Sequence, residues 1–124
     1  MKKAINCQKA PGAIGPYSQA IETMGMVFVS GQLPIDAETG VMPQGAKEQT
    51  RQSLENVKHI LEEVDLTMND VVKTTVFLAD MSLFAEMNEI YSVYFKAPFP
   101  ARSAVAVKAL PKGALVEIEC IAVR

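Results

Sequence analysis

The chain has 124 residues, of which 49% are hydrophobic and 21% charged, with a formal net charge of −2. This length suits one domain with one core over residues 1–124, and the lack of any Lys/Arg cluster argues against general nucleic-acid binding. The N-terminus lacks the apolar stretch of a signal peptide, and no apolar run approaches the roughly 20 residues of a membrane span, so we expect a soluble cytoplasmic protein.

The N-terminal half is predicted to contain short strands followed by one long helix. Segments 4–7 and 19–21 are weak strand candidates, and 27–29 is a stronger one. Residues 46–66 contain neither Gly nor Pro, and their apolar residues recur at spacings of three and four, which predicts an amphipathic helix. The apolar stripe of this helix comprises Leu54, Val57, Leu61 and Val64.

The C-terminal half is predicted to contain three strands. The segment 71–79 is rich in β-branched residues and is typical of a central strand. Segments 103–107 and 115–123 form two more strands, joined through a turn at 111–113.

A second helix is predicted over residues 81–95, with Asp80 or Ser82 as its cap. Its apolar residues cover a wide arc, so we expect it to be buried on more than one side. Asn88 lies in its middle between two aromatic residues, although asparagine is a poor helix former. Either Asn88 faces water or its amide has a specific partner.

This order of elements predicts an α+β fold with a mixed β-sheet and both helices packed on one face. The other face of the sheet would then carry apolar residues that no helix covers. Because such a face normally finds a partner, we expect a homo-oligomer.

The cysteines and the histidine indicate neither a disulfide nor a metal site. Cys7 and Cys120 lie far apart without a C-x-x-C spacing, so both are predicted to be free thiols, with Cys120 in the core. His59 is the only histidine and falls off the apolar stripe of its helix, where a surface position is expected. One histidine without a paired cysteine motif does not support a zinc site, and no spacing suggests another metal.

Arg102 is the first candidate for chemistry. It enters a predicted strand whose alternation places Arg102, Ala104 and Ala106 on one face. Small residues beside a guanidinium leave room for a ligand, and its planar fork suits a carboxylate or a phosphate. The alternatives are an ordinary surface arginine and an internal salt bridge.

Glu117 is the second candidate. Glu117 and Glu119 share one face of a predicted strand, and the apolar residues between and around them share the other. Burial of a carboxyl group would raise its pKa into a range useful for acid–base chemistry. The alternative is an edge strand with one solvated face.

Two glycine-containing segments form the third candidate. Tyr17 lies in segment 15–19, and Ser30 and Gly31 lie in segment 29–34, each beside a strand. Gly31 could let a ligand approach the backbone closely. The alternative is that both segments are only turns.

Six motifs occur in order along the chain. They are AIGPYSQA (13–20), SGQLP (30–34), QSLENV (52–57), VKTTVF (72–77), PARS (100–103) and LPK with EIE (110–112, 117–119). Together they closely resemble the RidA/YjgF family of reactive intermediate deaminases, and the resemblance covers essentially the whole chain.

The resemblance implies a chorismate-mutase-like fold assembled as a homotrimer, with a barrel-like core and clefts between subunits. It implies hydrolysis of small 2-imino acids and their enamine tautomers to 2-oxo acids and ammonia, as in 2-iminobutanoate/2-iminopropanoate deaminases. These imines arise when pyridoxal-phosphate enzymes dehydrate serine or threonine. The resemblance implies neither a metal nor an organic cofactor.

The resemblance also assigns roles to individual residues. Arg102 matches the arginine that binds the substrate carboxylate, and Glu117 matches the acid that positions the attacking water. Further substrate-binding positions are Tyr17, Ser30, Gly31 (through its backbone), Asn88 and Ala104. Many relatives carry cysteine at the position of Ala104, so no thiol is available there. The loop 95–99 looks shorter than in typical relatives, which could change the preferred substrate size.

Two other functions stay open from the sequence. The same cleft would serve a non-catalytic trimer that binds a 2-oxo acid or another small carboxylate and regulates a metabolic partner. RNA cleavage or translation inhibition, suggested for some relatives, is disfavoured by a pI of about 5.4.

Overall fold

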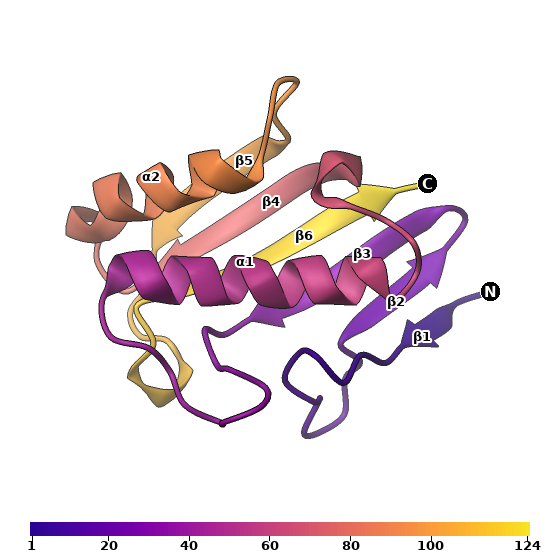
Figure 1. Ribbon diagram of the computed structural model, residues 1–124, viewed down its shortest axis with the longest axis horizontal. Helices are drawn as coiled ribbons and strands as arrows, with labels where there is room; N and C mark the ends of the chain where they lie inside the picture. The colour runs from indigo at the N-terminus through magenta and orange to yellow at the C-terminus, as the bar shows by residue number, and fades with distance from the viewer.

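Six strands form one mixed sheet, and both helices lie on the same face of it in the computed structural model, which describes residues 1–124 (Figure 1). This arrangement confirms the predicted α+β class. The elements in chain order are β1 (Lys3–Ile5), β2 (Ala20–Thr23), β3 (Met26–Gln32), α1 (Ala46–Glu62), β4 (Val71–Leu78), α2 (Phe84–Tyr94), β5 (Ala101–Ala106) and β6 (Val116–Val123).

The strands run in the order β1-β2-β3-β6-β4-β5, and every pairing is antiparallel except β4 with β5. The parallel pair follows from α2, which crosses between these strands, since parallel strands need a long connection. The chain passes from β5 to β6 through a 3₁₀ turn at Pro111–Gly113, as predicted. The two strands are not neighbours, however, because β4 lies between them.

Helix α1 begins at Ala46 as predicted but ends at Glu62, four residues early. The amide of Leu66 donates to the carbonyl of Leu61, and that of Asp65 donates to Glu62. Asp65 adopts a left-handed conformation with φ of 61°. These bonds form a Schellman motif, which usually has glycine at the position of Asp65. The predicted end was wrong because the sequence carries no glycine there.

Helix α2 also differs from its prediction. A short 3₁₀ turn, Met81–Leu83, precedes it, and the side chain of Asp80 caps this turn by accepting from the amide of Ser82. The expected burial on several sides is wrong for the single chain. Met87, Ile90 and Tyr91 are buried, whereas the opposite side, including Val93, is exposed.

The hydrophobic core lies between the sheet and the two helices. Leu54, Val57 and Leu61 of α1 are fully buried as predicted, while Val64 beyond the helix is only partly buried. Cys7 and Cys120 are buried free thiols, which confirms that prediction. His59 remains partly exposed beside Glu55 and Glu62 on the helical surface.

The sheet face opposite the helices is uncovered, as expected (Figure 1). Phe28 of β3 and Val105 of β5 are exposed on it, at 39% and 45%.

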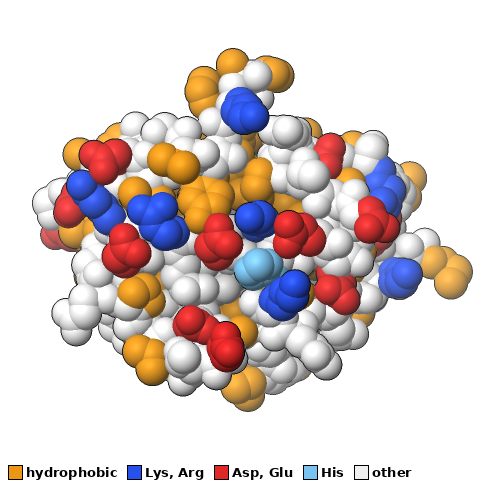
Figure 2. All heavy atoms as spheres, viewed as in Figure 1, with side chains coloured by type: hydrophobic (Ala, Val, Ile, Leu, Met, Phe, Trp, Pro, Cys, Tyr) orange, Lys and Arg blue, Asp and Glu red, His pale blue; other side chains and the backbone are white.

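The helical face is different: Figure 2 shows Lys/Arg and Asp/Glu side chains intermixed over it, without a patch of one sign. Neither α1 nor α2 has the length and the hydropathy that a membrane-spanning helix requires.

The strand boundaries place the candidate residues inside the sheet. β5 begins at Ala101, so Arg102 belongs to the strand itself. β3 continues to Gln32 and contains Ser30 and Gly31 as a bulge opposite Glu119, so this segment is not a turn. The weak candidates 4–7 and 19–21 correspond to β1 and β2.

Candidate active site

Arg102 lies on the helical face of the sheet. Its register partner in β4 is Thr74, whose partner in β6 is Cys120. Thr74 and Cys120 are buried beneath the helices, and residues directly opposite in register share one face of a sheet. Arg102 therefore points toward α2, at the edge of the sheet that β5 forms.

The guanidinium of Arg102 is held by α2. Its Nη1 donates to Oδ1 of Asn88 at 2.7 Å, and its Cζ lies 4.7 Å from the ring centroid of Tyr91 and 5.4 Å from that of Phe84. Asn88 thus has a specific partner. None of the five ion pairs in the chain involves Arg102, so the internal salt bridge considered from the sequence is absent. The guanidinium keeps its capacity to bind an external anion.

Glu117 lies on the uncovered face of the sheet. Val116 and Ile118 beside it are fully buried in the core, so alternation directs Glu117 away from the helices. Burial raises the pKa of its carboxyl group, and the charge of Glu119 raises this pKa further. No ion pair or hydrogen bond within the chain holds this carboxylate, which leaves it able to accept from a water.

Gly31 provides the space that Glu117 occupies. A Cβ atom at Gly31 would overlap Oε2 of Glu117 and lie 2.9 Å from its Cδ. The backbone of Gly31 is not in the left-handed region, so glycine is needed here for space rather than for conformation. The bulge of β3 therefore brings Gly31 and Glu117 together.

One chain does not bring Arg102 and Glu117 together. Glu117 is in register with Phe77 of β4, whereas Arg102 is in register with Thr74, and these two β4 residues point to opposite faces. The chain carries two half-sites: the arginine half-site (Arg102, Asn88, Phe84 and Tyr91) and the glutamate half-site (Glu117 and Gly31).

Tyr17 and Ser30 lie near the glutamate half-site. Tyr17 and Gly31 line one cavity of about 430 Å³ together with Ile14 and Leu33. Tyr17 is 55% exposed on its loop. The hydroxyl of Ser30 is already engaged, because it donates to the carbonyl of Ser18 at 2.6 Å.

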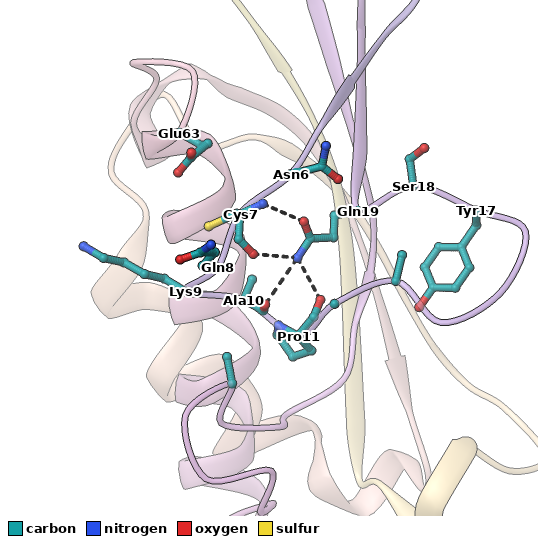
Figure 3. A pocket seen from close by; sticks show the side chains of 13 residues that line it. Asn6, Cys7, Gln8, Lys9, Ala10, Pro11, Tyr17, Ser18, Gln19 and Glu63 are labelled. Carbon is teal, nitrogen blue, oxygen red and sulfur yellow. Dashed lines mark hydrogen bonds between the residues drawn. The ribbon is translucent and has the colours of Figure 1, made fainter.

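Gln19 anchors the loop that carries Tyr17. Its side-chain amide accepts from the amide of Cys7 and donates to the carbonyls of Cys7, Ala10 and Pro11, as Figure 3 shows. Figure 3 also shows Tyr17 on the loop beyond this anchor, with its ring away from the bonds of Gln19. The surrounding cavity of about 810 Å³ contains Tyr17 but neither Arg102 nor Glu117, so the largest hollow is not where the candidate chemistry lies.

Ala104 follows Arg102 on the same face of β5 and packs against the core. No group of three or more His, Cys, Asp or Glu side chains could hold a metal ion.

Comparison with known proteins places this chain in a family. The model of the family described as "Endoribonuclease L-PSP" matches residues 7–124. The chain belongs to this family, the RidA/YjgF family.

Full-length relatives agree with this membership. A RutC family protein of Pyrococcus abyssi is 55% identical over 98% of this chain and 96% of its own. A protein of Salmonella typhimurium named 2-iminobutanoate/2-iminopropanoate deaminase is 50% identical over 100% of this chain and 99% of its own. The crystal structure of Escherichia coli TdcF with bound serine has a TM-score of 0.95 at 48% identity, covering 98% of both chains.

Three residues around Arg102 in this RidA/YjgF protein were not identified as site residues from the sequence. Phe84 and Tyr91 contact the guanidinium, and Thr74 bonds the hydroxyl of Tyr91 at 2.7 Å. The spacing of Phe84, Asn88 and Tyr91 by four and three residues was a usable signal, because it places them on one side of a helix. Nothing in the local sequence indicated which strand this side would cover.

Proposed function

We propose that this protein is an imine deaminase that hydrolyses small 2-imino acids, and their enamine tautomers, to 2-oxo acids and ammonia. The observation that carries the proposal is the guanidinium of Arg102, which α2 holds in place and no carboxylate of the chain neutralises. The full-length relative named as a deaminase of 2-iminobutanoate and 2-iminopropanoate supports a substrate of this class.

The proposed chemistry needs a bound carboxylate and an oriented water. Arg102 binds the carboxylate of the substrate, a charge-assisted contact of about 1.5–3 kcal/mol. Glu117 accepts a proton from water as the water oxygen bonds to the imine carbon and the C=N π pair moves to nitrogen. In the resulting carbinolamine, the protonated Glu117 returns this proton to the NH2 group. Its carboxylate then takes the proton of the hydroxyl group as the C–N bond breaks, so that the carbonyl forms and ammonia leaves. The iminium carbon is already electrophilic, so orientation of the water is the main requirement.

We propose that two copies of the chain complete each site. Arg102 and Glu117 lie on opposite faces of one sheet, so the arginine half-site of one subunit would have to meet the glutamate half-site of another. The uncovered face with Phe28 and Val105 supports association of the chain with itself. The family resemblance suggests a homotrimer with a barrel-like core. Light scattering would test this, and a monomer at micromolar concentration would contradict it.

The test of the activity is a coupled assay that generates 2-aminoacrylate from serine and follows loss of the imine. We expect the wild-type protein to accelerate imine loss and Arg102→Ala to raise KM about 10- to 150-fold. Arg102→Lys keeps the charge but loses the planar fork, so it should recover only part of this affinity. No acceleration by the wild type, or full activity of Arg102→Ala, would refute the proposal.

Two other results would point to other functions. Calorimetric binding of 2-oxobutyrate by a protein inactive in the coupled assay would indicate a carboxylate-binding regulator. Salt-dependent RNA binding or RNA cleavage would indicate the nuclease named in the family description. We do not favour the nuclease, because the chain has a net charge of −2 and its helical face mixes both signs (Figure 2).

A further inference from the structure

We infer that Tyr91, anchored by Thr74, is a positioning residue that orients the guanidinium of Arg102 for a carboxylate. The inference rests on the proposed function for its ligand, but its structural part can be tested without any ligand. It adds residues of β4 and α2 to the site that no family resemblance assigned.

Tyr91 is held firmly in three ways. It is buried, its hydroxyl is 2.7 Å from Oγ1 of Thr74, and its ring lies 4.5 Å from that of Phe95. Thr74 is itself buried at 1% exposure, so this hydrogen bond is shielded from water. The ring of Tyr91 therefore has a fixed place above the sheet.

Arg102, the residue that Tyr91 orients, lies next to Thr74 in the sheet. Thr74 and Arg102 are direct register partners on β4 and β5, and Tyr91 reaches both. Its hydroxyl contacts Thr74, while its ring lies 4.7 Å from Cζ of Arg102. A cation at this distance from an aromatic ring is attracted to it.

The contacts of Arg102 restrict its freedom but occupy only one of its N–H donors. Of the five N–H donors of a guanidinium, the one bonded to Asn88 is occupied, and Phe84 and Tyr91 contact the group without accepting a full hydrogen bond. A guanidinium that rotates freely loses this freedom when it binds a carboxylate, which costs entropy. Because the contacts with α2 already restrict the guanidinium of Arg102, less entropy is lost on binding.

The variant Tyr91→Leu tests this role, with Tyr94→Leu as its matched control. Tyr94 is a partly buried tyrosine of the same helix whose hydroxyl donates to Glu55. The hydrogen bond and the ring contacts of Arg102 go to other residues. Both variants lose an aromatic ring and a hydrogen bond. Only Tyr91→Leu should change the behaviour of Arg102.

The first readout is the ¹⁵N–¹H heteronuclear NOE of Arg102 Nε, which needs no ligand. We expect a high value in the wild type and Tyr94→Leu, and a low value in Tyr91→Leu. The second readout is calorimetric affinity for 2-oxobutyrate and for its uncharged amide. We expect Tyr91→Leu to weaken only the acid, by about three- to tenfold. A purely structural role would weaken both ligands alike.

The outcomes separate this inference from the proposed function. An unchanged NOE in Tyr91→Leu, or equal weakening of acid and amide, would overturn the inference. If the wild type fails to bind 2-oxobutyrate while the NOE pattern is as expected, the proposed function fails and the orienting role stands. If Tyr91→Leu does not fold, Thr74→Val replaces it, since this removes the anchor but keeps the ring. A rigid Arg102 in Thr74→Val would then count against the inference.

Discussion

Substitution of Gly31 by alanine would displace the carboxylate of Glu117 while leaving the arginine half-site untouched. The new Cβ would overlap Oε2 of Glu117 and lie 2.9 Å from Cδ, whereas ordinary van der Waals contact begins at 3.4 Å. The carboxylate is the far end of a flexible side chain, so it can move by about 1 Å instead of unfolding the strand. Its position relative to the attacking water would then be lost.

The size of the effect follows from the role of position in catalysis. A misplacement of about 1 Å can reduce a rate about 100-fold, so we expect kcat of Gly31→Ala to fall about 10- to 100-fold. KM should change little, because Arg102 binds the carboxylate elsewhere. Stability should also change little. Gly31 has no left-handed backbone to strain, and a Gly→Ala change restricts the unfolded chain by about 0.4–1 kcal/mol, which offsets the crowding.

The coupled assay on the wild type and four variants would test this reasoning. Gly12→Ala is the matched control, since a Cβ there meets nothing within 4 Å and its φ is not left-handed. In the Glu117→Ala background, Gly31→Ala should cost nothing further, because the displaced group is already gone. Full activity of Gly31→Ala would refute the argument, as would an additional loss in the Glu117→Ala background. A rise in KM alone would show that Gly31 serves a backbone contact with the substrate instead.

Three further predictions concern Glu117 and the end of α1. Because burial raises the pKa of Glu117 above its ordinary 4.5, kcat/KM should fall tenfold per pH unit below that raised pKa, and Glu117→Gln should abolish this limb. A carboxyl group whose pKa is higher in the folded than in the unfolded protein stabilises the fold fully only below its unfolded-state pKa, and this stabilisation is lost as the pH rises through its folded-state pKa. At pH 7 the charged Glu117 therefore lacks this stabilisation, and calorimetry should show a higher Tm for Glu117→Gln. A lower Tm would contradict this prediction. Asp65→Gly should raise the free energy of unfolding in urea by about 0.5–1 kcal/mol, because glycine suits the φ of 61° at this position. The control Asp70→Gly should lower the free energy of unfolding, because it removes the capping box of the following turn. Destabilisation by Asp65→Gly would count against the Schellman assignment.

The elements that the sequence predicted well have either a strong period or a distinct composition. The apolar stripe of α1 follows from spacings of three and four, and the two faces of β6 follow from alternation. β4 follows from its β-branched residues instead. The end of α1 was missed, because Asp65 takes a conformation that usually signals itself through glycine. Ser30 and Gly31 were open to interpretation as a turn, because a bulge in a strand and a turn attract the same residue types.

The sequence by itself determined which side chains share a face within one strand. Glu117 had to point away from Val116 and Ile118, and Arg102 had to share a face with Ala104, because side chains alternate along a strand. Only the tertiary structure decided how these faces relate to each other. The registers of β4 with β5 and β6 place Arg102 beneath α2 and Glu117 on the uncovered side. Alternation within a strand carries no information about a neighbour's register, since pairing is set by hydrogen bonds and core packing between strands.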